Sequence, residues 1–271
     1  MNLRAPAVMI ASGVSLYAGA AVAVGLFDVL PPVIVAWFRI SAAALILLVL
    51  VRPRLRDFRS PSALVYGVAT MGMNMSFYEA IARLPLGTAV AVEFLGPVLV
   101  AVLGSRSLRD WLALGLATLG VVVISGAVWS TAAVGLGFAL LAGGLWAVYI
   151  VVGSRIVGSS DSPRTSMTVG FSLAAVLALP FMVWLWPADV GTPGTTLLGL
   201  ALGLGVLSAV IPYTLDQVVM RMAGAAHFAL LQALLPVVAA VLGAVALGQW
   251  LSGAEMLGIV LVVAAVALRR S

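Results

Sequence analysis

The sequence predicts an all-α integral membrane protein with ten transmembrane helices, arranged as two inverted five-helix repeats. Three observations support this fold class: the composition, the spacing of the apolar runs and an internal repeat. Of the 271 residues, 63% are hydrophobic and only 8% are charged, whereas soluble domains carry about 25% charged residues. A globular core could not bury this much apolar surface, so lipid must form part of the solvent.

The charged and reactive residues exclude several functional classes. The net charge is +5, but every basic residue is an arginine, and these are spread between apolar runs. This spacing fits membrane topology rather than a nucleic-acid-binding face. The chain has no cysteine, no lysine and one histidine, which excludes disulfides, thiolate metal sites and Schiff-base lysines. We therefore expect no metal, no cofactor and no nucleic-acid partner.

The helices are placed from apolar runs of spanning length, roughly 17–25 residues. The first run follows Arg4 and holds about 20 apolar residues, which suits a retained span better than a signal peptide. The long run over 112–152 must break once, and Trp129, Ser130 and Thr131 are its most polar stretch. The expected helices lie near 6–26, 31–51, 61–82, 85–104, 108–127, 132–152, 165–186, 194–215, 225–247 and 252–268.

Orientation follows from the arginines in the connecting loops. With ten helices, twelve arginines fall on one side, and only Arg83 falls in a loop on the other. Cytoplasmic loops carry the excess of basic residues. Both termini are therefore expected in the cytoplasm.

The internal repeat appears when Pro97 is aligned with Pro236. LGPVLVAVLG (95–104) then lies on LLPVVAAVLG (234–243) without a gap, and Glu93 falls on Gln232. The alternative is a chance similarity between small, apolar helices. Both prolines should kink their helices, as gating elements or as structural prolines.

The repeat divides the chain into two candidate domains, 1–129 and 130–271, each with five helices. Because five is odd, the second half enters the membrane from the opposite side. Inverted repeats are common in secondary transporters, whose substrate site lies near the midplane between the halves.

Three polar side chains in the first half are expected at one depth. Arg39, Asn74 and Glu93 each lie eight residues from the outer end of their helices, which is roughly 12 Å at the helical rise per residue. Tyr78 follows Asn74 by one turn and faces the same way. Because a lone charge in a membrane is costly, Arg39 and Glu93 should pair. The pair either fixes two helices or handles substrate or protons. Glu79 and Arg83, spaced i and i+4, are expected as a surface pair.

The second half offers fewer polar candidates. Trp146 and Tyr149 suit either a cavity wall or the interfacial aromatic belt. Tyr213 and Asp216 end the eighth predicted helix, near the cytoplasmic mouth. Gln232, in register with Glu93, is a candidate cavity residue.

Three stretches carry a resemblance to a known family: GVATMGMNMSFYEAIARLPLGTAVAVEFLGPVLVAVL (67–103), GFALLAGGLWAVYIVVGSR (137–155) and LGLGVLSAVIPYTLD (202–216). They resemble the EamA-type drug/metabolite transporters, most closely the bacterial threonine/homoserine exporter group. The resemblance implies a proton-coupled exporter of small amino acids or related metabolites in the bacterial inner membrane. The positions that match the family pattern are Arg39, Asn74, Tyr78, Glu93, Trp146, Tyr149 and Tyr213.

The chain departs from that pattern at three acidic positions. Asp216 stands where glutamate is expected, Leu235 replaces an acidic residue, and Gln249 replaces the glutamate of an LGE motif. Two alternatives stay open: export of other metabolites or amphipathic drugs, and lipid flipping. An intramembrane enzyme is disfavoured because no nucleophile–base set or metal cluster can be assembled.

Overall fold

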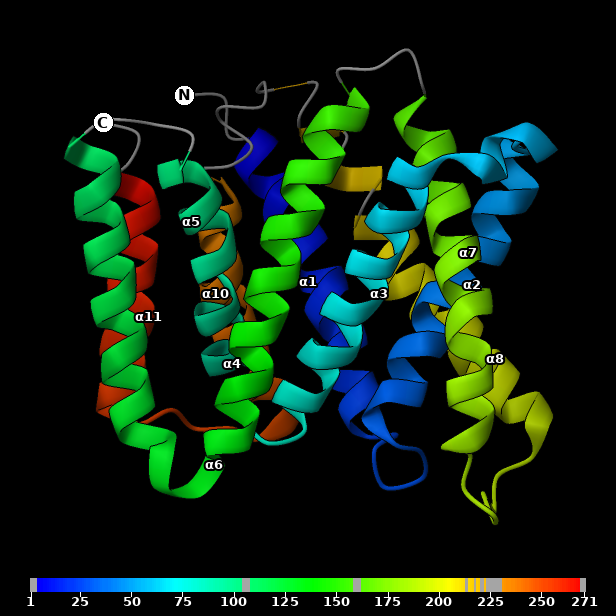
Figure 1. The fold of residues 1–271 in the computed structure, drawn as a ribbon. Coiled ribbons are helices and arrows are strands. Elements are labelled where there is room, and N and C mark those ends of the chain that lie inside the picture. Colours follow the sequence, from blue (N-terminus) through cyan, green and yellow to red (C-terminus); the bar gives the residue numbers. More distant parts are fainter. Residues whose placement is uncertain are drawn as a thin grey trace.

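The computed structural model describes residues 4–103, 108–157, 162–212, 214–216, 218–219, 222 and 231–268 (Figure 1). In these residues every regular element is helical, which confirms the all-α class. The elements are α1 (Arg4–Val24), α2 (Pro32–Val51), η1 (Leu55–Arg59), α3 (Pro61–Ile81), α4 (Leu86–Glu93), α5 (Leu95–Leu103), α6 (Leu108–Val157), α7 (Pro163–Trp184), α8 (Gly194–Gly205), η2 (Val206–Val210), η3 (Gln232–Leu234), α10 (Leu235–Leu247) and α11 (Gly253–Leu268).

Several stretches of the described chain are long and apolar enough to cross a membrane. Five of them reach membrane length: Arg4–Val24, Pro32–Val51, Ala132–Gly153, Arg164–Trp184 and Gly194–Asp216. Shorter apolar stretches accompany them: Leu86–Val100, Trp111–Ile124, Leu235–Leu247 and Gly253–Leu268. The chain is therefore a membrane protein, while the count of ten spans and the inverted repeat stay predictions.

Helix ends follow local sequence signals. Pro61 opens α3, where its missing N–H falls among donors that have no helical partner. The Ser60 side chain caps the same helix by accepting the Ala63 N–H at 3.3 Å. At the C-terminus of α10, Gly248 has φ 65°, the left-handed conformation that glycine adopts freely.

Two interruptions predicted from the sequence are present. The long helix α6 breaks at Ala132, whose φ of −145° is non-helical, directly after the predicted break at 129–131. Helix α4 ends at Glu93, and α5 begins two residues later with Pro97 in its first turn. Because proline has no N–H, the Glu93 carbonyl loses its helical partner. Pro236 likewise lies in the first turn of α10, after the 3-10 turn η3.

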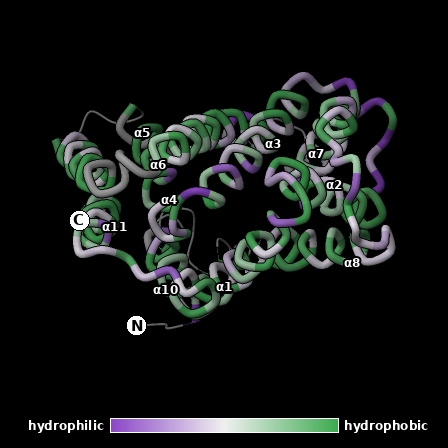
Figure 2. Tube along the Cα trace, turned by 90° about the horizontal axis from the view of Figure 1, so that it is seen from below, coloured by the Kyte–Doolittle hydropathy of each residue, from purple (hydrophilic) through white to green (hydrophobic). Residues whose placement is uncertain are grey.

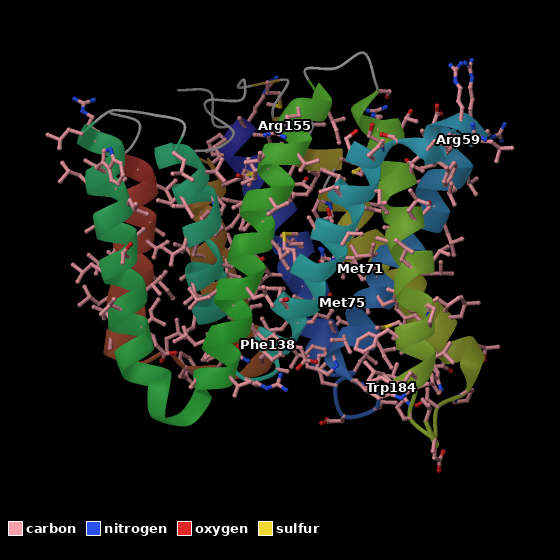
Figure 3. All side chains as sticks on the ribbon, viewed as in Figure 1. Arg59, Met71, Met75, Phe138, Arg155 and Trp184 are labelled. Atoms are coloured by element: carbon pink, nitrogen blue, oxygen red, sulfur yellow. The ribbon has the colours of Figure 1, made fainter. Side chains whose placement is uncertain are left out.

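The two ends of the bundle differ in charge. Helix α1 begins and α11 ends at the same end (Figure 1), where Arg59 and Arg155 also lie (Figure 3). We call this the arginine end. The opposite end, called the far end, holds Trp184 and Phe138 (Figure 3). Figure 2, which views the protein from the far end, shows that most helical residues are hydrophobic.

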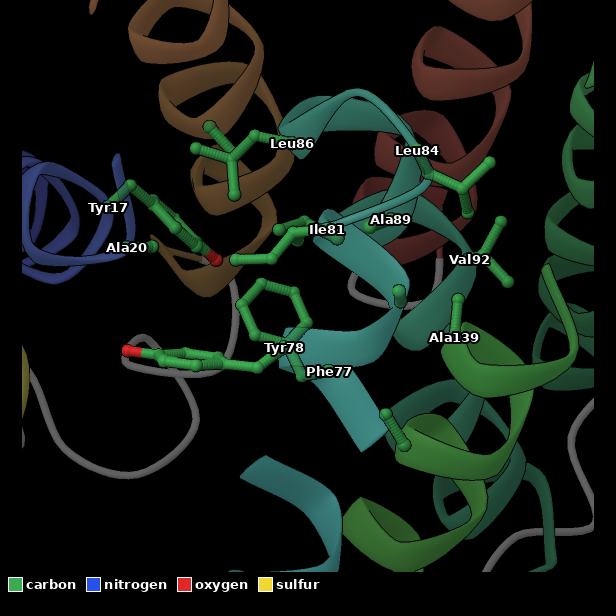
Figure 4. Close-up of a cluster of buried hydrophobic side chains, with 14 of the residues drawn as sticks. Tyr17, Ala20, Phe77, Tyr78, Ile81, Leu84, Leu86, Ala89, Val92 and Ala139 are labelled. Atoms are coloured by element: carbon green, nitrogen blue, oxygen red, sulfur yellow. The ribbon is translucent and has the colours of Figure 1, made fainter. Parts of the chain in front are cut away.

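The buried core consists of one large cluster and two smaller ones. The large cluster joins residues of α1, α2, α3, α4, α6, α7, α8, α10 and α11, part of which is drawn in Figure 4. Two separate clusters lie nearer the arginine end. One joins α2, α3, α6 and α7 around Tyr66 and Phe171, and the other joins α5, α6 and α11 around Val98 and Ala117.

Candidate functional site

Arg39 of α2 is buried among polar groups from three other segments. Only 5% of it is exposed. Its Nη1 donates to Asn74 Oδ1 of α3 at 2.6 Å, and its Nη2 donates to the Ser208 carbonyl at 2.5 Å. The guanidinium also lies over the Tyr78 ring, 5.9 Å from the centroid. The structure brings Arg39 and Asn74, which were predicted to lie at one depth, into direct contact.

Asn74 is itself held in place by its own helix. Its amide donates to the Thr70 carbonyl, one turn earlier, at 2.8 Å. This bond turns the side-chain oxygen toward Arg39. A buried arginine with charge-assisted hydrogen bonds is thereby fixed in one orientation.

Glu93 lies at the end of α4 and is 7% exposed, and its side chain has no hydrogen-bond or ion-pair partner among the residues that the structure describes. The predicted contact with Arg39 is therefore wrong as a direct ion pair. The reason is geometric: Asn74 and Ser208 offer closer acceptors, and equal depth does not determine which way two side chains point. The two charges still act on each other at longer range.

In the described part of the chain, two polar atoms beside these charges lack a partner. Arg39 Nε and the Tyr78 hydroxyl are both buried there without a hydrogen bond. Tyr78 is fully buried, with its ring against Phe27 at a centroid distance of 5.9 Å. Since buried polar groups are normally satisfied, unpaired ones at one location call for a functional explanation.

Tyr17 of α1 belongs to the same region and was missed from the sequence. It is 4% exposed, and its hydroxyl lies within electrostatic range of Glu93, Arg39 and Asp216. Figure 4 shows it reaching from α1 toward the side chains of α3. A signal was available: Tyr17 lies seven residues before the far end of α1, so the depth argument applied to Arg39 also applies here.

Asp216 connects to α1 rather than to a solvated loop. It accepts a hydrogen bond from Ser12 Oγ at 2.6 Å and is half-buried. Ser15 of the same helix donates to the Leu207 carbonyl at 2.5 Å. These contacts bind α1 to the segment after α8. Tyr213, predicted beside Asp216, lies outside the described residues.

Trp146 and Tyr149 face the interior of the protein. Trp146 meets Phe94 edge to face at 5.0 Å, and the Tyr149 ring lies 4.7 Å from that of Tyr66, centroid to centroid. These contacts favour an interior wall over the interfacial belt. Gln232 is half-buried in the first position of η3.

At the far end, Glu79 and Arg83 form the predicted i, i+4 ion pair. A second set of contacts there was not predicted. Gln249 Oε1 accepts the Leu86 N–H at the start of α4, at 2.9 Å. The buried Glu255 accepts from Thr88 Oγ1 of α4 at 2.8 Å and from the Ser252 N–H at 2.9 Å. We call these contacts the far-end clamp, since they tie α4 to the turn between α10 and α11.

An apolar groove of about 340 Å³ lies between α2 and α8. Trp37 and Trp186 contribute aromatic walls, and Trp37 Nε1 is satisfied by the Ala175 carbonyl at 2.9 Å. The Ser41 hydroxyl at this groove is buried without a partner.

Three comparisons with known proteins fit this arrangement. The sequence model of the EamA-like transporter family matches residues 133–270. The threonine/homoserine exporter RhtA of Salmonella typhimurium (strain SL1344) is 34% identical over 265 residues, which cover 93% of this chain and 86% of that protein. The same exporter from Escherichia coli (strain K12) is 32% identical over 272 residues, covering 95% and 88%. A solved crystal structure, 23% identical, shares the fold with a TM-score of 0.64 over 98% of this chain and 97% of the other.

Proposed function

The chain belongs to the EamA-like transporter family and is a transporter of small metabolites, not an enzyme, and from this premise we propose that it exports small amino acids such as threonine and homoserine. The two relatives named as threonine/homoserine exporters match nearly the whole chain, which supports this substrate class. The proposed location is the bacterial inner membrane, with both termini in the cytoplasm.

One observation carries the proposal: a buried arginine and a buried glutamate occupy the same region without neutralising each other. Arg39 is held by Asn74 and Ser208, while Glu93 has no hydrogen-bond partner. An unpaired ionisable group inside a membrane protein is costly and by default functional. A small zwitterion offers both charges that these residues lack.

Proton coupling is proposed through Glu93. A buried carboxylate without a donor costs free energy unless a cation or a proton neutralises it. A substrate ammonium and a proton would therefore compete for Glu93, and each cycle would exchange one for the other. Arg39 from α2 acts electrostatically on Glu93, and Tyr17 from α1 lies within electrostatic range of Glu93, Arg39 and Asp216.

Close helix contacts support the proposed inverted repeat of 1–129 and 130–271. A Cβ added to Gly96 of α5 would lie 1.9 Å from the Gly143 carbonyl oxygen of α6. The proline alignment puts Gly96 on Leu235, and Leu235 makes the corresponding contact with α1. A Cβ on Gly13 would lie 2.9 Å from Leu235 Cδ2.

A second pair of close contacts is also related by exchange of the two halves. A Cβ on Gly67 of α3 would lie 1.9 Å from the Gly170 carbonyl oxygen of α7. Exchanging the halves turns this α3–α7 contact into one between α8 and α2. There, a Cβ on Gly205 would lie 2.7 Å from the Ala42 Cβ. Matched close contacts favour two related halves over chance similarity of composition.

The far-end clamp supports an inward-facing state in an alternating-access cycle. It ties α4 to the turn between α10 and α11 and so holds the far end closed. Export would then require the clamp to open while the arginine end closes. The interruptions before Pro97 and Pro236 are the proposed hinges.

The proposal is tested with purified protein in liposomes loaded with labelled threonine or homoserine. We expect efflux above that of protein-free liposomes, and faster efflux when the outside is acidic. Efflux that does not respond to the pH gradient would contradict proton coupling. Absence of amino-acid efflux, with export of an amphipathic dye instead, would contradict the substrate class.

Orientation has its own test, because the chain contains no cysteine. Ser60→Cys, at the arginine end, should react only with reagent on the cytoplasmic side. Thr192→Cys, in the far-end turn between α7 and α8, should react only from the periplasm. Periplasmic labelling of Ser60→Cys would reverse the topology.

The groove between α2 and α8 favours a second candidate, the transport of amphipathic compounds or lipids. Its apolar walls, including Trp37 and Trp186, would accept an alkyl chain or aromatic ring from the bilayer. Ala201→Trp places a bulky side chain in the groove. It should leave threonine efflux intact and abolish transport of amphipathic compounds or lipids. Equal loss of both activities would count against a separate lateral path.

A further inference from the structure

Three chemically different groups are available in one region of the bundle. Among the described residues, the buried Arg39 Nε and Tyr78 hydroxyl have no hydrogen-bond partner, and no ion pair involves the Glu93 carboxylate. All three residues are more than nine-tenths buried. They come from α2, α3 and α4, and Tyr17 connects the region electrostatically to Arg39 and Glu93.

The free side of Arg39 has a fixed direction. A guanidinium is a rigid plane with five N–H donors. Nη1 and Nη2 are engaged by Asn74 and Ser208, so the plane cannot rotate without breaking both bonds. Nε is the guanidinium nitrogen that has no hydrogen bond among the described residues, and the plane lies over the Tyr78 ring. The nearby Tyr78 hydroxyl offers a second unpaired donor.

The chemistry of these groups divides them into a carboxylate-binding set and an ammonium-binding group. An arginine N–H and a phenol both donate to a carboxylate, and charge-assisted bonds of this kind are strong. Glu93 can instead accept from an ammonium group. Arg39 and Glu93 together carry no net charge, so a bound zwitterion leaves the site neutral and all its charges compensated.

Resting on the proposed export of amino acids, we propose that Arg39 and Tyr78 bind the substrate carboxylate and that Glu93 binds the substrate ammonium. Arg39 Nε and the Tyr78 hydroxyl are buried in the present conformation, so binding of the carboxylate requires a helix beside them to move. Asn74 is then a positioning residue, because it acts on the substrate through Arg39. The site should reject compounds that carry only one of the two charges.

Two analogues of threonine separate the two ends. 1-Aminopropan-2-ol lacks the carboxylate, and 3-hydroxybutyrate lacks the ammonium. Their competition against labelled threonine is measured by equilibrium binding to the purified protein in nanodiscs. Binding still reports on variants that no longer translocate, and the thermal shift caused by each analogue covers variants with weak threonine binding.

The proposal predicts a crossed pattern. Glu93→Gln should lower the preference for threonine over 3-hydroxybutyrate by about 10-fold to 100-fold, the value of one lost hydrogen bond to a charged group. Its preference for threonine over 1-aminopropan-2-ol should not change. Tyr78→Phe should instead lower the preference for threonine over 1-aminopropan-2-ol and leave the preference over 3-hydroxybutyrate unchanged. Arg39→Lys, which keeps the charge but loses the planar donor, should follow Tyr78→Phe.

Glu255→Gln is the matched control, because Glu255 is equally buried but bonded within the far-end clamp. It should keep both wild-type preferences. Wild-type threonine binding with unchanged preferences in Glu93→Gln would overturn this assignment and leave the proposed function standing. Failure of the wild type to bind any amino acid would overturn both.

Discussion

Replacing Asn74 by leucine should destabilise the protein more than its size suggests, because it removes an acceptor from a buried charge. The substitution nearly keeps the side-chain volume but deletes the 2.6 Å bond from Arg39. A hydrogen bond to a charged group is worth about 1.5–3 kcal/mol. The neutral bond from Asn74 to the Thr70 carbonyl is also lost. Arg39 would retain only the Ser208 carbonyl.

Ser172→Ala is the control for loss of the neutral hydrogen bond from Asn74 to the Thr70 carbonyl. Ser172 is buried on α7 and donates to the carbonyl one turn earlier at 2.8 Å, as Asn74 does. Its loss should cost about 1 kcal/mol or less. The free energy of unfolding, measured by denaturant titration in mixed micelles, should therefore fall by about 1.5–3 kcal/mol more for Asn74→Leu than for Ser172→Ala. Equal losses would show that Asn74 does not stabilise the Arg39 charge.

Three further outcomes follow from the contacts. Because Arg39 and Glu93 act on each other electrostatically without a direct ion pair, the double variant should recover only about 0.5–1 kcal/mol of the summed stability losses of Arg39→Leu and Glu93→Gln; recovery of most of the loss would indicate a direct pair. Gly96→Ala puts a Cβ against a backbone oxygen at 1.9 Å and should lower the melting temperature, whereas Gly144→Ala meets no atom within 4 Å and should not. Gln249→Ala should weaken the far-end clamp and lower the melting temperature, while Gln249→Glu, which keeps an acceptor for α4, should not.

Helix positions were largely predictable because their signals are local. Apolar length, prolines at helix starts and the polar break before Ala132 all act within a few residues. The shared level of Arg39 and Asn74 also followed from counting residues along straight helices. Depth in a membrane is a one-dimensional quantity, and the sequence specifies it well.

Contacts that depend on rotation and on distant segments were not predictable. The pairing of Arg39 with Glu93 failed because the Ser208 carbonyl, 169 residues further along, lies closer to Arg39. The acceptor role of Gln249 toward Leu86 joins residues 163 apart. From the sequence, Gln249 was noted only because it replaces an expected glutamate. Its amide oxygen nevertheless accepts the Leu86 N–H. Tyr17 was predictable in depth from its place in α1, but the distant groups near which it lies, Glu93 and Asp216, were not.

The central claim is that a small amino acid binds within the polar layer of Arg39, Tyr78 and Glu93. The most direct measurement is an experimental structure of the protein in lipid nanodiscs with homoserine. The account predicts density for the ligand between α2, α3 and α4, with its carboxylate at Arg39 Nε and its ammonium at Glu93. Homoserine bound elsewhere, for example in the groove between α2 and α8 with this layer unchanged, would contradict it.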